Sequence, residues 1–204
     1  MTSSRTLAPV AVQRIHGGVS SSGLLSGGTT TIKGMGSYIV LDFGKEVGGI
    51  TSLQFGAVSD RAQSVFLAFS ESILYTGPQS DLSSGRPADG SLSVTAAANG
   101  SYRVPSENLR GGFRYLTIGL QTSGSVELSG VTLYFTPAPT LSDLRAYSGS
   151  FRSNDDLINR VWYAGAYTVQ MDTIDPLQGR VWPPPSSGWL NNEVGGSGDR
   201  KSVV

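Results

Sequence analysis

The stretch SYIVLDFGKEVGGITSLQFGAV, from Ser37 to Val58, decides the fold class. It holds two runs rich in β-branched and aromatic residues, 37–43 and 50–58, and the segment Gly44–Gly49 separates them. Such runs, bounded by glycine breaks, are typical of β-strands. Because glycine readily adopts the positive φ angles of a tight turn, the sequence predicts a hairpin whose loop is Gly44–Gly49.

More strands are expected beyond this stretch. SVFLAFSES, at Ser64–Ser72, carries apolar residues on both faces, which is typical of a central strand. A polar surface loop is expected after Tyr75, and such loops often carry function. The strand candidates SLSVTAA, GSYRV, GFRYLTIGL and VELSGVTLYF follow, with turns about every 8–12 residues. We therefore predict a mainly β protein, with a jelly-roll-like antiparallel β-sandwich over residues 1–150. Its first part, 1–36, is a lead whose patches LAPVAV and TTTIK are candidate edge strands.

Composition supports this fold and excludes several functions. The 27 glycines, 10 prolines and 15% charged residues favour turns and short strands over a helical bundle. The formal net charge of +0 gives no attraction to nucleic acid or to an anionic membrane, and neither is expected as a partner. No run approaches the roughly 18 apolar residues of a membrane span, and the first residues lack the apolar segment of a signal peptide. The sequence leaves the compartment open.

The residues of metal and nucleophilic sites are scarce. Cysteine is absent, which excludes disulfides and thiolate sites. The single histidine, His16, is expected to be a solvated loop residue. A Ser-His-Asp arrangement or a multi-histidine metal site therefore has almost nothing to be built from, and we expect neither a metal nor a cofactor.

A helix is expected over residues 151–175. Ser153 fits as its N-cap, with Asp156 at the third helical position, and Asp175-Pro176 ends it. An isolated helix of this length is marginal in water, so its apolar stripe must pack on the sandwich or on a partner outside this sequence. The irregular Pro/Gly-rich tail 176–204 follows. The stripe consists of Leu157, Ile158, Val161, Trp162, Ala164, Gly165, Thr168 and Val169.

Three segments together carry a family resemblance. They are IVLDFGKEVGGI, RGGFRYLTI and SNDDLINRVWYAGAYTVQMDTIDPLQGRVWPPPSSGWLNN. In this order and at similar spacing they resemble α-L-rhamnosidases of glycoside hydrolase family seventy-eight, especially fungal members. The resemblance covers the chain from Leu7 to Asn192. Members of this family are usually secreted in fungi.

The resemblance implies a modular enzyme in which β-sandwich domains precede a catalytic (α/α) barrel. The helix at 151–175 would then lead into that barrel. The family hydrolyses terminal α-L-rhamnose with inversion, which requires a general acid and a general base. Its acid-rich motif begins with an Asp-Arg pair, and Asp199-Arg200 is similar to this pair, but the acids beyond it do not appear. We therefore assign no catalytic residue. The sequence is expected to be an N-terminal fragment that is inactive by itself.

Trp182 and Trp189 are the candidate substrate-binding residues. Both lie in a proline-stiffened segment that presents an indole face at little entropic cost, and sugar rings stack on such faces. A rhamnosylated glycoside is the expected ligand. The alternative for both tryptophans is packing against the barrel.

Other polar and aromatic residues have ordinary explanations. Asp42 and Glu46 are interpreted as a strand-end acid and a polar turn, with nothing nearby to shift either pKa. Glu71 is an equally weak candidate. The segment from Arg110 to Arg114 is expected to enter a strand. On the helix, the residues expected to serve in the core or at an interface are Trp162, Tyr163 and Tyr167.

Two other functions stay open. The first is a stand-alone carbohydrate-binding sandwich, which uses one sheet face or the Trp182/Trp189 segment. The second is a structural domain. In the structural alternative, the exposed helix face packs on another domain or self-associates.

Overall fold

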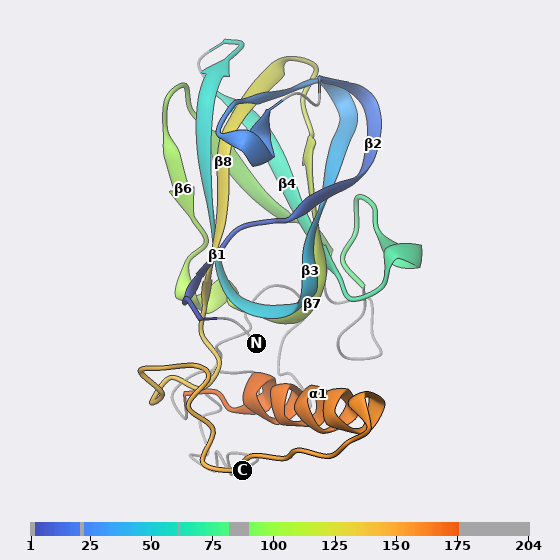
Figure 1. Ribbon diagram of the computed structural model, residues 1–204. Helices are drawn as coiled ribbons and strands as arrows, with labels where there is room; N and C mark the ends of the chain where they lie inside the picture. The colour runs from blue at the N-terminus through green and yellow to red at the C-terminus, as the bar shows by residue number, and fades with distance from the viewer. Residues whose placement is uncertain (1–2, 21–22, 61, 82–89, 176–204) are drawn as a thin grey trace.

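The computed structural model describes residues 3–20, 23–60, 62–81 and 90–175 (Figure 1). These residues form an antiparallel sheet that curls over itself, followed by an α-helix. The predicted mainly β, sandwich-like fold with one C-terminal helix is confirmed. The strands are β1 Thr6–Leu7, β2 Ala11–Ser20, β3 Thr30–Val58, β4 Gln63–Ser70, β5 Leu92–Ala96, β6 Ser101–Arg103, β7 Arg110–Leu120 and β8 Ser125–Phe135. The 3-10 turns are η1 Leu24–Ser26, η2 Ile73–Tyr75 and η3 Ser106–Asn108, and the helix is α1 Asp156–Asp172.

Strand β3 joins the two layers of the sandwich. Its first part, residues 30–33, pairs with β2 and β8, and its middle part, 38–42, pairs with β2 and β7. Its last part, 50–58, pairs with β8 again. The predicted hairpin at Gly44–Gly49 is therefore wrong. The two flanking runs do not pair with each other, because each pairs with a strand that comes much later in the chain. The glycines form the corner where β3 crosses from one layer to the other.

The core lies between these layers. One layer has the order β2, β3, β7, β4, β5, and in the other β8 lies between β1 and the last part of β3, with β6 beyond it. Strand β4 is central and buried on both faces, as its sequence predicts. The largest fully buried side chains are Phe69, Phe113, Phe135, Ile32, Ile39, Leu41, Leu53, Leu67, Leu116, Ile118, Leu120 and Leu128.

Much of the described part of the lead 1–36 lies in the sheet, as β1, β2 and the start of β3. Strand β2 pairs along most of its own length with the first and middle parts of β3. Two bulges let β2 bend together with these parts. His16 lies on this strand and not in a loop, so that expectation is wrong in structure, although its side chain is exposed as expected. Its ring stacks on the Tyr38 ring at a centroid distance of 4.9 Å.

Helix α1 begins two residues later than the capping box suggests. Asp155 is the N-cap: its Oδ1 accepts hydrogen bonds from the backbone N–H of Leu157 at 2.8 Å and of Ile158 at 3.3 Å. Ser153, the predicted cap, instead bonds to the backbone of Asp155. The carboxylate reaches two free N–H groups at once, so it is the better cap for the first turn.

One face of α1 rests on the end of the sandwich where β3 turns (Figure 1). The Tyr167 hydroxyl donates to the Glu46 carbonyl oxygen at 2.6 Å, and the rings of Tyr167 and Phe135 stack at 6.5 Å. Gln170 is buried and donates to the Leu144 carbonyl oxygen at 2.9 Å. The contact is therefore aromatic and polar, and it uses the face that the sequence pattern did not select.

The predicted apolar stripe points away from this contact. Leu157, Val161 and Val169 are 66%, 64% and 67% exposed, and Ile158 is 49% exposed. The stripe does not pack on the sandwich. Among the described residues, no helix combines the length and the apolarity needed to cross a membrane.

Candidate functional site

Charged side chains gather at the end of the sandwich that faces α1. They come from the corner of β3, the end of β4 with the loop after it, and the start of β7. We call this group the charged end. Its members are Asp42, Glu46, Glu71, Asp81, Arg110 and Arg114.

Asp42 and Arg114 form a two-pronged ion pair in the charged end. Arg114 Nε donates to Asp42 Oδ1 at 2.8 Å, and Arg114 Nη2 donates to Asp42 Oδ2 at 2.9 Å. The Gly44 backbone N–H also donates to Oδ1, at 2.6 Å. The hydrogen bond from Arg114 is the main reason that the pKa of Asp42 lies below its usual value. Asp42 therefore stays ionised and fixes the start of the β3 corner.

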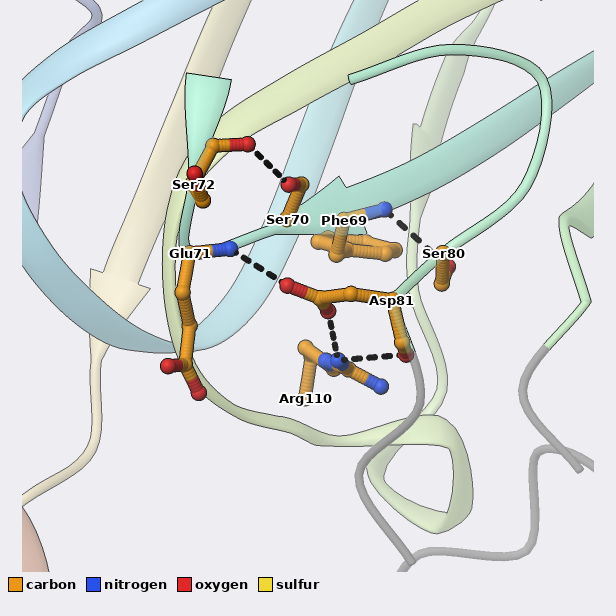
Figure 2. Close-up of polar contacts among 7 residues, drawn as sticks. All are labelled: Phe69, Ser70, Glu71, Ser72, Ser80, Asp81 and Arg110. Carbon is orange, nitrogen blue, oxygen red and sulfur yellow. Dashed lines mark hydrogen bonds and ion pairs between the residues drawn. The ribbon is translucent and has the colours of Figure 1, made fainter. Parts of the chain in front are cut away.

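Asp81 is the second anchor of the charged end (Figure 2). Its Oδ1 accepts from Arg110 Nη2 at 2.8 Å, and the Arg110 side chain is only 5% exposed. Its Oδ2 accepts from the Glu71 backbone N–H at 2.7 Å, and its own N–H donates to the Phe69 carbonyl oxygen at 3.0 Å. Asp81 thus ties the far end of the loop after β4 back to the end of that strand.

Glu46 is the carboxyl group that this end perturbs most. It is half-buried, and Gly112 makes room for it: a Cβ on Gly112 would lie 2.5 Å from Glu46 Oε1. Burial raises the pKa of Glu46 to about 7, and the carboxylates of Glu71 and Asp81 add to this effect. The expectation that nothing nearby shifts the pKa of Asp42 or Glu46 is therefore wrong. The partners are distant in sequence and meet only in the fold.

Replacing Glu46 should change how stability depends on pH. Because the folded-state pKa of about 7 lies above the usual 4.5, the folded state holds the proton more tightly, and its stability falls as the pH rises from 4.5 through 7. Glu46→Gln removes this loss. We expect it to stabilise the protein by about 1 kcal/mol at pH 8, after allowance for solvent screening, and to have little effect at pH 4. Urea unfolding at both pH values measures the difference.

A control variant separates this effect from a general change of surface charge. Glu107→Gln removes an exposed carboxyl on η3, away from the charged end, and should leave the pH profile of the wild type unchanged. Equal stabilisation by Glu46→Gln at pH 4 and pH 8 would contradict the assignment of Glu46 as the titrating group.

The loop held by Asp81 carries an exposed apolar tip. Leu74 is 80% exposed and Tyr75 is 69% exposed. Beside them lies an open hollow of about 340 Å³ lined by Tyr75, Thr76, Gly77, Pro78 and Gln79. We call residues 73–79 the Tyr75 loop. Sequence reasoning located a surface loop after Tyr75 but did not select the tyrosine as a binding residue, and the Gly-Pro pair that follows it was the signal available.

The predicted binding residues lie elsewhere. Trp182 and Trp189 are outside the described residues, and their role stays a prediction. Trp162 is half-buried and stacks on Phe151 at 6.0 Å, whereas Tyr167 contacts the sandwich, as expected for an interface residue. The segment after Arg110 enters β7 as expected. Within the described part of the chain, no group of three or more His, Cys, Asp or Glu side chains is arranged to hold a metal ion.

Comparison with known proteins relates the fold to rhamnosidases. No protein-family model matches the sequence, and no curated protein matches it. A rhamnosidase from Klebsiella oxytoca, solved with rhamnose bound, is similar over 83% of this chain and 35% of its own, with a TM-score of 0.58 at 15% identity. A GH78 family rhamnosidase of Bacillus sp. GL1 is similar over 68% of this chain and 13% of its own, with a TM-score of 0.52 at 23% identity.

These similarities concern the fold, since both identities are low. The chain spans about a third of the Klebsiella enzyme and about an eighth of the Bacillus enzyme. Both sources are bacteria, so nothing here supports the expected fungal character. The CBM32 module of AlyQ, solved with 4,5-unsaturated mannuronic acid, is matched over 63% of this chain and 97% of its own, with a TM-score of 0.40 at 14% identity. The described chain is thus a β-sandwich domain that is similar in fold to part of known rhamnosidases.

Proposed function

We propose that this chain is the non-catalytic β-sandwich part of a glycoside hydrolase of the α-L-rhamnosidase type. In this proposal, residues 1–150 form an accessory domain and residues 151–175 connect it to a helical catalytic domain. The parent enzyme would release terminal α-L-rhamnose from glycosides. The three sequence segments that resemble family seventy-eight support this assignment, and so does the fold similarity to two rhamnosidases.

The orientation of α1 is the main structural support for the proposal. The helix is held to the sandwich through Tyr167 and Gln170, while Leu157 and Val161 on its other side stay more than half exposed. A helix that packs on one body through one face and exposes an apolar stripe on another is normally covered by a second body. The sandwich supplies one of them, and a following helical domain is the natural second.

The charged end does not supply the acid and base of an inverting hydrolase. Two of its carboxylates are bound to arginines, at 2.8 Å in Asp42–Arg114 and at 2.8 Å in Asp81–Arg110. Such pairing keeps both groups ionised and neutralised, which suits a structural anchor more than a proton donor or acceptor. Burial raises the pKa of Glu46 to about 7. Among the described residues this leaves, apart from Glu71, a single carboxyl group at the charged end without an arginine partner of its own, and inversion needs two groups on opposite sides of the sugar. The catalytic pair is therefore assigned to the parent's helical domain.

Sequencing the transcript through and beyond the codon for Val204 tests the proposal directly. A frame that continues into an acid-rich segment and a series of paired helices supports it. A transcript in which no such frame follows overturns it and leaves a stand-alone sandwich.

The purified chain should show no rhamnosidase activity. We expect the release of 4-nitrophenol from 4-nitrophenyl α-L-rhamnoside to equal that of a heat-killed sample, because the proposal assigns the catalytic acid and base to the parent's helical domain. An active rhamnosidase assayed in parallel confirms that the assay works. Release well above the heat-killed control would contradict the non-catalytic assignment.

A further inference from the structure

We propose that the Tyr75 loop is a binding site for an uncharged sugar ring, with the Tyr75 side chain as its stacking face. This inference rests on the proposed function for the choice of a carbohydrate ligand. It adds a site in the loop that the sequence placed on the surface, with Tyr75 as a binding residue that the sequence did not select, and it does not involve Trp182 or Trp189.

The exposure of the loop tip is the first argument. Tyr75 and Leu74 are 69% and 80% exposed, although neighbouring aromatic side chains such as Phe69 are buried. An apolar surface exposed at a loop tip contributes no hydrophobic stabilisation to the fold. Tyrosine is favoured where one end of the side chain contacts a ligand and the other meets water. The aliphatic C–H face of a sugar ring complements such an aromatic surface.

The rigidity of the loop is the second argument. Ser72 Oγ accepts from the Leu74 backbone N–H at 3.3 Å, and Thr76 Oγ1 donates to the Ile73 carbonyl oxygen at 2.9 Å. Asp81 closes the base of the loop, and Ser80 Oγ accepts from the Phe69 N–H at 3.0 Å (Figure 2). A loop whose backbone is held in place before binding loses less entropy when the ligand arrives.

The chemistry of the hollow is the third argument. The hollow is shallow and open, with a volume of about 340 Å³, so a single sugar ring can rest in it against the loop. Its lining holds a phenol, a hydroxyl, an amide and backbone groups, and no charged side chain. The carboxylates of Glu71 and Asp81 lie at the base of the loop and disfavour an anionic ligand. An uncharged polyhydroxylated ring fits these groups best.

Backbone NMR of the full chain tests the site. Methyl α-L-rhamnopyranoside, methyl β-D-galactopyranoside and methyl β-D-glucopyranoside are titrated separately, with glucuronic acid as the charged comparison. We expect saturable shifts of the Thr76, Gly77 and Gln79 amides with at least one neutral glycoside, and none with the acid. Absence of saturable shifts in these amides with all three glycosides would overturn the proposal.

Matched variants identify the stacking residue. Tyr75→Ala should weaken binding by roughly tenfold, whereas Tyr75→Phe keeps the ring and should keep most of the affinity. Tyr163→Ala removes another exposed tyrosine, 40% exposed on α1, and should bind as the wild type does. Unchanged affinity in Tyr75→Ala would also overturn the proposal. Because the transcript result does not depend on these titrations, failure of this site is distinguishable from failure of the proposed function.

Discussion

Gly49→Ala should leave the chain unable to fold to its native state. Gly49 ends the corner of β3 with φ at +145°, which side chains of L-residues rarely allow. A Cβ there would lie 2.0 Å from the Tyr134 carbonyl oxygen, a backbone atom fixed in β8. Neither layer can move away, because Gly49 pairs with both β7 and β8. We expect a loss of more than about 4 kcal/mol, which is a large share of the stability of a domain of this size.

Circular dichroism and thermal unfolding measure this result. Gly165→Ala is the matched control: Gly165 lies on the exposed side of α1, and a Cβ there meets nothing within 4 Å. Because alanine is favoured over glycine within a helix, this variant should gain about 0.5–1 kcal/mol. A Gly49→Ala protein that unfolds cooperatively at the wild-type temperature would contradict the crossing of β3.

Asp81→Ala should cost about 3–5 kcal/mol of folding free energy. The change takes the Asp81 carboxylate away from Arg110, whose side chain is 5% exposed. Removing one partner of a buried ion pair lowers the free energy of unfolding. It also removes the acceptor for the Glu71 N–H. The loop after β4 should open as a result, and the Tyr75 loop should lose its fixed shape.

Urea unfolding gives the free energy, and limited proteolysis between Glu71 and Asp81 reports the opening of the loop. Asp172→Ala removes an exposed carboxylate at the end of α1 and should change stability by no more than about 0.5 kcal/mol. Equal stability of Asp81→Ala and the wild type would show that the ion pair with Arg110 is not an anchor of the charged end.

Local pattern predicted the elements well. The runs at 37–43 and 50–58 lie in strands, and the run at 64–72 does so up to Ser70. The helix begins and ends close to the expected positions, because the strand and helix periods can be read from adjacent residues. The partners of these elements were harder to predict. The segment Gly44–Gly49 has the composition of a hairpin loop, and only pairing with β7 and β8 makes it a corner.

The charged end shows the same limit. Asp42 meets Arg114 and Asp81 meets Arg110 across 72 and 29 positions of sequence, so neither pair forms a recognisable motif. The raised pKa of Glu46 follows from burial and from these neighbours, which the sequence alone did not bring together. For α1, the stripe was correctly identified as apolar, but the helix docks through Tyr167 and a buried Gln170, because specific hydrogen bonds to backbone carbonyls decided its orientation.

The crossing of β3 also has a kinetic consequence. Its residue Tyr38 pairs with Gly119, and its residue Ile50 pairs with Tyr134, so the strand can be completed only after more than eighty further residues have been brought back to it. Proteins dominated by such distant contacts fold slowly, on the scale of milliseconds to seconds, because the entropy of loop closure is lost before the stabilising contacts form. Because one continuous strand serves both layers, neither layer is an independent folding unit. The sandwich should form in a single late step and come apart in one.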